Sequence, residues 1–428
     1  MMTPIYLDHN ASSPLLPEAA EAMRAVWMEA GGNPASAHHA GRKARQRLED
    51  ARERVAAALG ASPDEVIFTS GATEANNLAL FGLTACPSPP LRFGRGRGRG
   101  HACQPAPELA KSRKRVEGDN PTPRPPPRSG EWEQNPGHLL AAPIEHPCVI
   151  EPLNQLAAVG FAVEWLPVTP RGQVEQRQVL ARVRDDTRLV ALMLANHETG
   201  AIQPVRHVTK TLPKGIPLHC DAAQAVGKIP VNFRDLGVTT LTASAHKFGG
   251  PPGVGLLLLK RDTKLTPRAF GGHQQRGHRP GTEPVALAVG LATALDHAVT
   301  HLDANRAKLD ELRQRLLDRL QAVGPVVNGP QPGDPDGLPT TLNLSFPGCR
   351  ADVLLMALDL AGVACSAGSA CSSGSLLPSP VLRAMGVPDE GLRSAVRFSL
   401  GPSLTEADVD DAAGRITRCV QDVRGRGT

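Results

Sequence analysis

Short apolar runs recur along the chain between residues 66 and 259, separated by stretches that include helical periodicity. One such stretch, residues 40–59, repeats apolar side chains every three or four positions, as an amphipathic helix does. A strand that is apolar throughout is buried on both faces, which is typical of a parallel sheet covered by helices. The pattern therefore predicts an α/β fold with a mostly parallel sheet. The runs are residues 66–69, 162–166, 189–194, 217–220, 241–243 and 254–259.

The pattern changes after about residue 264. A long charged helix is expected over residues 302–323, and a strand over residues 341–346. A chain of 428 residues is long enough for two hydrophobic cores. We therefore expect a large domain over residues 16–263 and a smaller α+β domain built from residues 1–15 and 264–428.

Residues 87–137 differ in composition from the rest of the chain. They hold ten Arg or Lys against five Asp or Glu, and eleven of the forty prolines. Such a segment cannot bury a core, so we expect a disordered, exposed and basic insertion. It could tether nucleic acid or a protein, but we favour a tolerated loop expansion, because long surface insertions cost little free energy. The net charge of +5 is confined to this segment, so the sequence gives little reason to expect a nucleic-acid partner.

The eight cysteines are scattered without the CxxC spacing of a zinc site or a disulfide framework. We therefore expect reduced thiols and no metal site. No apolar run approaches the ~20 residues of a membrane helix, and the N-terminal residues lack the pattern of a secretory signal. These features predict a cytoplasmic protein with no membrane contact, in which one thiol is available as a nucleophile.

Three of the predicted strands are followed by residues that suit one cofactor. Ligands of a wound sheet bind beyond the carboxyl ends of its strands. Gly71 opens a helix whose free amides suit a phosphate, Asp221 can pair with a protonated ring nitrogen, and Lys247 can form an imine. Singly, each has an ordinary explanation, namely a turn, a helix cap and a solvated charge. Together, on successive strand ends, they predict a site for pyridoxal 5′-phosphate.

Seven motifs stand in the order seen in the cysteine desulfurases, and the chain resembles the NifS and IscS-like group of the class-V aminotransferase family. The motifs are SGATEANN, EHPCVIEP, ANHETG, DAAQAVGK, SAHKFGGPPG, RPGTEP and SAGSACSSGSLLPSP. The resemblance runs from YLDHNASSP to VRFSLG, interrupted by the insertion. It implies the PLP-dependent transferase fold type I, with a seven-stranded sheet and helices on both faces.

The resemblance also implies an activity and partners. The enzyme would remove sulfur from L-cysteine, releasing L-alanine and keeping the sulfur as a persulfide for iron–sulfur cluster assembly or other sulfur transfer. An obligate homodimer would be required. The sulfur would pass to an acceptor such as an iron–sulfur scaffold protein or a tRNA-thiolation enzyme.

Roles follow from the resemblance residue by residue. Lys247 would form the imine with the cofactor, and His146 would be a catalytic residue stacked on its ring. Asp221 would hold the ring nitrogen protonated, and Gln224 would bind the phenolic oxygen. The phosphate would be bound by Ala72, Thr73, Ser244 and His246, and by Thr282 across the dimer interface.

Two residues are assigned to the substrate, and two departures from the family are visible. Asn196 and Arg397 would bind substrate, because a guanidinium can grip both oxygens of a carboxylate. A structural ion pair is the alternative for Arg397. His197 stands where the family usually has a second Asn, and imidazole can still donate one hydrogen bond to the cofactor. Residues 271–276, GGHQQR, also depart from the family, with no evident consequence.

The segment 364–380 is rich in Ser and Gly, which is typical of a mobile loop. Such a loop would let Cys371, the catalytic nucleophile in this resemblance, reach the substrate sulfur and then deliver it. Cys365 is the competing thiol, but residues 367–371 match the family's site, so Cys365 is expected to be a small buried residue. Cys371 could also be a transient ligand of an iron–sulfur cluster.

Three other functions are compatible with parts of this pattern. A selenocysteine lyase would use the same residues on selenium. Another enzyme with the class-V aminotransferase fold would not need Cys371. A degenerate scaffold that binds sulfur-transfer partners would not need Lys247, His146 and Cys371 together. The sequence does not identify the sulfur acceptor.

Overall fold

The computed structural model describes residues 3–29, 31–84, 136–367 and 378–425. The insertion expected over 87–137 lies outside these ranges, apart from Pro136 and Gly137. Gly137 already belongs to the fold, since its carbonyl accepts a hydrogen bond from the amide of Ala162 at 3.0 Å. Cys371 also lies outside the described residues.

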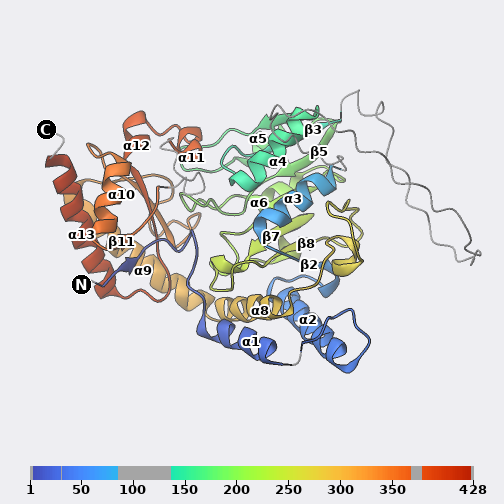
Figure 1. The fold of residues 1–428 in the computed structure, drawn as a ribbon. Coiled ribbons are helices and arrows are strands. Elements are labelled where there is room, and N and C mark those ends of the chain that lie inside the picture. Colours follow the sequence, from blue (N-terminus) through green and yellow to red (C-terminus); the bar gives the residue numbers. More distant parts are fainter. Residues whose placement is uncertain (1–2, 30, 85–135, 368–377, 426–428) are drawn as a thin grey trace, which may run out of the picture.

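A seven-stranded sheet forms the centre of the larger part of the molecule (Figure 1). Its strand order is β2-β8-β7-β6-β5-β3-β4, and β8 runs antiparallel to both neighbours, whereas the other pairs are parallel. The predicted mostly parallel α/β sheet is therefore confirmed. The strands are β2 (Val66–Thr69), β3 (His138–Ala141), β4 (Ala162–Trp165), β5 (Thr187–Ala191), β6 (Leu218–Asp221), β7 (Thr240–Ser244) and β8 (Gly255–Leu259).

Helices cover both faces of this sheet, which explains the continuous apolar character of its strands. In β3, Leu139 and Ala141 belong to the cluster formed with α3 and α4, whereas Leu140 belongs to the main core on the opposite face. Successive strand side chains point to opposite faces, so both positions must be apolar here. The helices of this part are α1 (Pro17–Met28), α2 (His39–Ala58), α3 (Ala72–Leu83), α4 (Pro147–Ala158), α5 (Gln176–Leu180), α6 (Val205–Thr211), α7 (Phe233–Leu236) and α8 (Val285–Thr300).

A second core is built from both ends of the chain and is seen on the left of Figure 1. There Leu7 packs in one cluster with Leu316, Phe398 and Ile416. The elements are a parallel pair, β1 (Ile5–Tyr6) with β11 (Val363–Ala364), an antiparallel sheet β12-β10-β9 (Ala395–Ser399, Thr341–Ser345, Val326–Val327), and helices α9 (Leu302–Leu320), α10 (Ala351–Leu360) and α13 (Glu406–Gly425). Two short helices near the C-terminal end of the chain, α11 (Pro380–Ala384) and α12 (Asp389–Ser394), place their buried apolar side chains in the first core instead.

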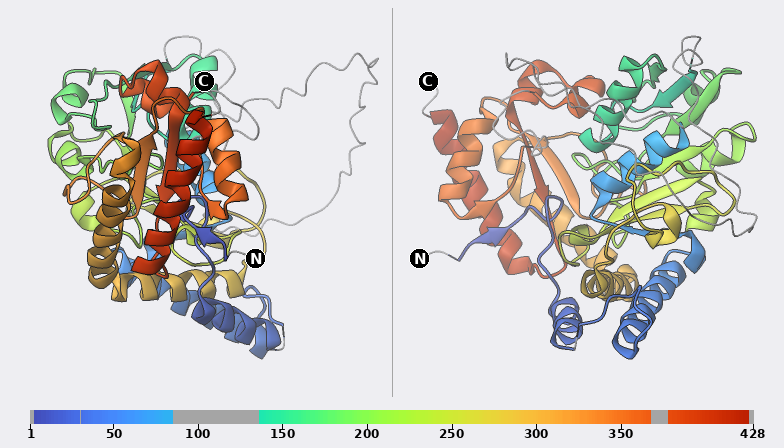
Figure 2. Two further views of the ribbon diagram at one scale, coloured as in Figure 1. Left: turned by 90° about the vertical axis from the view of Figure 1, so that its left-hand side faces the viewer. Right: turned by 45° about the vertical axis from the view of Figure 1, so that its right-hand side comes forward.

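Helix α8 lies beneath the large sheet, beside α1 and α2, in both views of Figure 2. Its buried side chains, among them Leu291 and Leu295, belong to the first core although they follow residue 264 in the sequence. The division into 16–263 and 1–15 with 264–428 stays a prediction. Four 3-10 turns complete the described elements: η1 (Pro63–Glu65), η2 (Ala245–Lys247), η3 (Gln274–Gly277) and η4 (Gln321–Val323).

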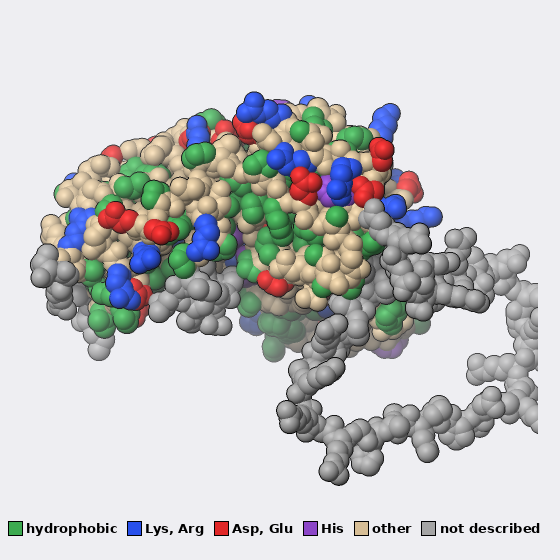
Figure 3. All heavy atoms as spheres, turned by 90° about the horizontal axis from the view of Figure 1, so that it is seen from above, with side chains coloured by type: hydrophobic (Ala, Val, Ile, Leu, Met, Phe, Trp, Pro, Cys, Tyr) green, Lys and Arg blue, Asp and Glu red, His purple; other side chains and the backbone are tan. Residues whose placement is uncertain are grey.

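Positive and negative side chains are interspersed with apolar ones on the face shown in Figure 3. Within the described ranges, no single helix has the length and apolar character needed to span a membrane. The bent pair Val285–Thr300 and Leu302–Val323, which meet at 69°, satisfies the same criteria of length and composition.

Candidate active site

A cavity of about 420 Å³ lies where the large sheet's strands β2, β6 and β7 end. Nine of the residues predicted to bind the cofactor or to act in catalysis line it, although they come from distant parts of the sequence. They are Ala72, Thr73, His146, His197, Asp221, Gln224, Ser244, His246 and Lys247. The carboxyl ends of neighbouring parallel strands therefore bring these motifs together, as expected for a wound sheet.

The first turn of α3 forms one end of the cavity. The helix begins at Ala72, directly after Gly71, so the amides of Ala72 and Thr73 have no partner within the helix. Such amides, at the positive end of the helix dipole, are suited to bind a phosphate. The strand β8 passes very close to this turn, because a Cβ atom on Gly255 would lie 2.6 Å from the Cα of Gly71. A glycine at position 255 is therefore required by the position of the turn.

Asp221 also lines the cavity and is held in place by several donors. Its Oδ1 accepts from the amide of Ala223 at 2.9 Å, and its Oδ2 accepts from Nδ2 of Asn76 at 2.7 Å. The thiol of Cys148 lies 3.8 Å from the same Oδ2. Burial raises the pKa of Cys148 well above its ordinary value of 9.0, so this thiol is protonated at neutral pH and does not compete as a nucleophile.

Asn76 was not singled out from the sequence, yet it fixes Asp221. Its Oδ1 accepts from Oγ1 of Thr242 at 2.7 Å and lies 3.0 Å from Nε2 of His219. Burial lowers the pKa of His219 to about 4, so this imidazole is neutral at pH 7. A signal was present in the sequence, because Asn76 follows Ala72 by four residues and so shares its helix face.

Lys247 lies in η2 and donates to two backbone carbonyls of the N-terminal segment. Its Nζ is 2.7 Å from the carbonyl oxygen of Asn10 and 3.0 Å from that of Ala11. The sequence motifs did not indicate this contact, because it joins positions more than 230 residues apart. The segment that follows β1 is therefore part of the site.

Two histidines that line the cavity contact each other edge to face. The rings of His146 and His197 have centroids 5.2 Å apart and an interplanar angle of 75°. Burial is the main cause that lowers the pKa of each imidazole, and the pKa of His197 falls well below 6.5. Both rings are therefore neutral at pH 7. Among the described residues, buried Nδ1 of His197 has no hydrogen-bond partner. An unpartnered buried polar atom on a side chain that lines a cavity favours a ligand there.

The two predicted substrate residues do not line this cavity. Asn196 is fully buried, and its Oδ1 accepts from the amides of Glu198 and Thr199, both at 2.9 Å. Arg397 donates to the carbonyl oxygen of His197 at 3.0 Å and forms an ion pair with Asp8 at 2.7 Å. The structural ion pair considered for Arg397 is thus present in this conformation, and contact with the substrate stays a prediction for both residues.

The two described ends of the predicted cysteine loop, at Ser366 and Ser379, are held by hydrogen bonds close to His197 in the structure. Ser366 donates to Oδ2 of Asp8 at 2.7 Å, and Ser379 donates to Oε2 of Glu198 at 2.5 Å. Cys371 lies between these ends, outside the described residues. Burial raises the pKa of Cys365 to about 12, which makes it a poor nucleophile at neutral pH.

Thr282 also lies outside the cavity, in an exposed loop before α8. This loop is fixed to the first turn of α3, because Arg279 forms an ion pair with Glu74 at 2.8 Å. The departure from the family at residues 271–276 has a structural role. Buried Gln275 accepts from the amide of Phe68 at 2.8 Å and donates to Glu283, which ties the loop to β2.

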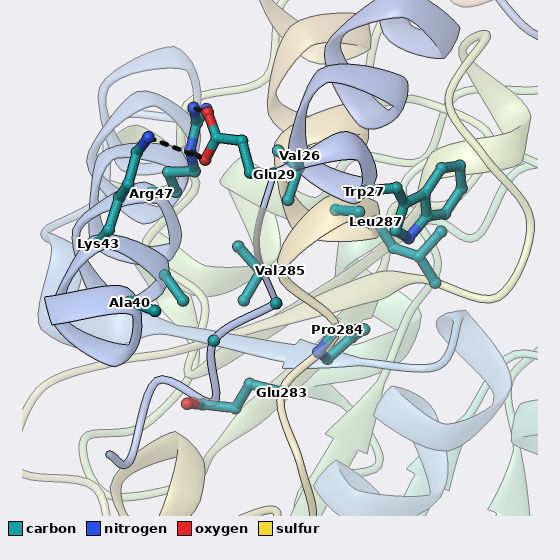
Figure 4. Close-up of a pocket in the computed structure, with 14 residues that line it drawn as sticks. Val26, Trp27, Glu29, Ala40, Lys43, Arg47, Glu283, Pro284, Val285 and Leu287 are labelled. Carbon is teal, nitrogen blue, oxygen red and sulfur yellow. Dashed lines mark hydrogen bonds and ion pairs between the residues drawn. The ribbon is translucent and has the colours of Figure 1, made fainter. Parts of the chain in front are cut away.

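A second cavity of about 420 Å³ lies between α1, α2 and the start of α8 (Figure 4). Trp27 and Leu287 line one side, and Glu283, the residue after Thr282, lies at another. Lys43 and Arg47 pair with Glu29 at its rim.

Within the described part of the chain, no group of three or more His, Cys, Asp or Glu side chains could hold a metal ion.

Comparisons with known proteins identify the family. The family model for aminotransferase class-V matches residues 5–90 and 130–411. The chain is 40% identical to an IscS-like cysteine desulfurase of Mycobacterium tuberculosis, over 95% of this chain and 94% of that one. It is 36% identical to the cysteine desulfurase IscS of Dictyoglomus turgidum, over 99% and 96%. The solved structure of a NifS-like protein matches with a TM-score of 0.82 and 33% identity, over 98% of this chain and all of that one. The predicted fold type I is thereby confirmed, and the chain belongs to the NifS/IscS-like cysteine desulfurases of the class-V aminotransferase family.

Proposed function

We propose that this cysteine desulfurase binds pyridoxal 5′-phosphate in the cavity around Lys247 and transfers the sulfur of L-cysteine to Cys371. The observation that carries the proposal is the convergence of the α3 amides, Asp221, His146 and Lys247 on one cavity. The same residue types in a chain of this family fit a phosphate, a protonated ring nitrogen and a reactive carbonyl. The unpartnered Nδ1 of His197 supports a ligand at this position.

The residues that line the cavity suit both the phosphate group and the ring of the cofactor. Ala72, Thr73 and Ser244 would hold the phosphate, and Lys247 would hold the cofactor covalently. Asp221 would keep the ring nitrogen protonated, because its carboxylate is positioned by Asn76. When bound, the cofactor supplies an electron sink for the carbon atoms of the substrate. Burial lowers the pKa of His146, so an uncharged ring would lie beside the cofactor, and its Nδ1 accepts a hydrogen bond from the amide of Cys148 at 3.2 Å.

Sulfur transfer then balances without any further reagent. The thiolate of Cys371 attacks the sulfur of L-cysteine, so that a sulfur–sulfur bond forms as the carbon–sulfur bond breaks. The electron pair of the broken bond stays with carbon, which takes up a proton and leaves as L-alanine. The enzyme keeps a persulfide on Cys371. Two contacts support an approach of the segment that carries Cys371 to the cavity. Ser366 is bound to Asp8, the partner of Arg397, which contacts His197. Ser379 is bound to Glu198, the residue after His197.

A homodimer is part of the proposal. Thr282 would reach the phosphate of a second copy, and two large apolar side chains are exposed, one beside the cavity that Glu283 lines and one in the loop before Thr282. Trp27 is 61% exposed beside the second cavity, and Phe270, in the loop leading to Thr282, is 87% exposed. Exposed apolar groups of this size favour a protein interface.

The remaining assignments concern the setting of the reaction. We propose a cytoplasmic enzyme that passes its persulfide sulfur to an iron–sulfur scaffold protein or a tRNA-thiolation enzyme, and whose substrate is held by Asn196 and Arg397. The larger domain would comprise residues 16–263, and the smaller domain the remainder. Co-purification of the full chain with its acceptor, followed by transfer of labelled sulfur, would identify the acceptor.

A matched pair of cysteine variants tests the mechanism. Cys371→Ser should retain the visible absorbance of the bound cofactor and lose alanine and sulfide formation from L-cysteine in the presence of dithiothreitol. Cys365→Ser should retain both, because desolvation of this partly buried thiol raises its pKa and keeps it protonated. Lys247→Ala should lose the covalent link to the cofactor. Full desulfurase activity in Cys371→Ser would refute the sulfur-transfer step, and much faster turnover of selenocysteine would favour the lyase.

A further inference from the structure

Lys228 is a buried lysine that the cofactor and sulfur chemistry above does not use. It lies seven residues after Asp221, and 8% of its surface is exposed. Its ammonium donates to Oδ1 of Asn10 at 2.8 Å and to Oε1 of Gln224 at 2.6 Å. Among the described residues it forms no ion pair with a carboxylate. An ammonium group is costly to bury, so its retention between two amide side chains calls for a reason.

The contact with Lys228 determines which way the Gln224 amide faces. A side-chain amide has one end that accepts and one that donates, whereas an ammonium group only donates. Oε1 of Gln224 must therefore face Lys228, because a flipped amide would place two donors against each other. Nε2 of Gln224 donates to the carbonyl oxygen of Asn10 at 3.0 Å, and Gln224 itself lines the cavity. The amide orientation is thus fixed, and after the hydrogen bond to Asn10 one of its two N–H groups is left for a ligand.

The same contacts link Lys228 to the reactive lysine. The carbonyl oxygen of Asn10 that accepts from Gln224 also accepts from Nζ of Lys247, and the side chain of Asn10 accepts from Lys228. Asn10 is itself held in place, since its Nδ2 donates to Oγ1 of Thr341 at 2.8 Å. Burial, together with the charges of Lys247 and Arg397, lowers the pKa of Lys228 well below its usual 10.5. Even a neutral amine keeps two N–H donors, so its contact with Gln224 persists in both forms.

We propose that Lys228 is a positioning residue that holds Gln224 as a hydrogen-bond donor toward the ring oxygen of the cofactor. This inference rests on the proposed function, because it concerns how the cavity receives pyridoxal 5′-phosphate. Lys228 itself does not line the cavity and acts through Gln224. Its removal should allow the amide to flip and to present an oxygen where a donor is needed.

A double-mutant cycle on cofactor binding tests the inference. The dissociation constant of pyridoxal 5′-phosphate is measured by titration of the cofactor-free full-length chain, for the native protein, Lys228→Met, Gln224→Met and the double variant. Each single change should weaken binding about tenfold, as expected for one well-oriented hydrogen bond. The double variant should bind within about threefold of Gln224→Met, because Lys228 would have nothing left to orient.

The outcomes separate this inference from the proposed function. Unchanged affinity in Lys228→Met, or a double variant about tenfold weaker than Gln224→Met, would overturn the role of Lys228 while leaving the cofactor site intact. A native chain that does not bind the cofactor would overturn both. If Lys228→Met does not fold, Lys228→Gln takes its place in the cycle, because an amide keeps a polar group beside Asn10 and Gln224 but can meet either end of the Gln224 amide. The absorption maximum of the bound cofactor gives an independent readout. It should move in the same direction in all three variants. If Lys228 serves only the fold, the maximum in Lys228→Met should equal that of the native protein.

Discussion

Glu198 should make the stability of the protein fall as the pH rises. Its carboxyl group is 1% exposed, and burial raises its pKa from 4.5 to about 7. The hydrogen bond from Ser379 and the charge of Arg397 oppose this rise without cancelling it. A carboxyl group whose pKa is higher in the folded state binds its proton more tightly there. Folding therefore carries no penalty below pH 4.5, and the penalty grows until the pH exceeds about 7.

The change Glu198→Gln removes this charge while keeping an oxygen that can accept from Ser379. The difference between a pKa of about 7 and one of 4.5 corresponds to about 3 kcal/mol. Relative to the native chain, the free energy of unfolding of the variant should therefore increase by about 3 kcal/mol between pH 4.5 and pH 8.5. Urea denaturation of both proteins across this range, followed by far-UV circular dichroism, measures that difference.

A matched control separates burial from the loss of one acid. Glu151 is an exposed residue on α4, so Glu151→Gln should leave the pH dependence of stability unchanged. If Glu198→Gln follows the native curve at every pH, the carboxylate of Glu198 is stabilised in the fold and the reasoning from burial is wrong. Parallel curves with a constant offset would also contradict it, because they would reflect lost packing instead of titration.

Two further changes concern the cofactor cavity. His197→Leu should weaken binding of pyridoxal 5′-phosphate about tenfold, because the hydrogen bond between Nδ1 and the ligand would be lost. His197→Asn should bind within about threefold of the native protein. Equal affinities of the two variants in a cofactor titration would contradict this hydrogen bond. Gly255→Ala should lower cofactor affinity by more than tenfold, since its Cβ atom would collide with the backbone of Gly71; a titration at native affinity would mean that the turn moves without cost.

The local patterns of the sequence predicted the sheet and most of the cavity, for a physical reason. Strand ends are marked by the switch from apolar runs to polar motifs, and parallel strands bring those motifs to one edge. Asp221 and Lys247 could therefore be placed together without any long-range information. The strand β3 was not foreseen, because it begins directly after the basic insertion, where no periodic pattern precedes it.

The contacts that hold the site together could not be predicted in the same way. Asn10 meets Lys247 and Lys228 across more than 200 residues, and Arg397 meets Asp8 across 389. No local periodicity carries such pairings, which depend on how two separate cores pack. Arg397 shows the limit most clearly, since its chemistry alone suited both a substrate clamp and a structural ion pair.

The short segment after β1 joins the two cores and also touches the reactive centre. Asp8 is bound to Arg397 of the second core, and two residues later Asn10 offers its carbonyl oxygen to Lys247. A displacement of the second core relative to the sheet would therefore pull on the acceptor of that lysine. The docking of another protein on the second core would therefore act through this segment on Lys247, the amine that we propose to hold the cofactor.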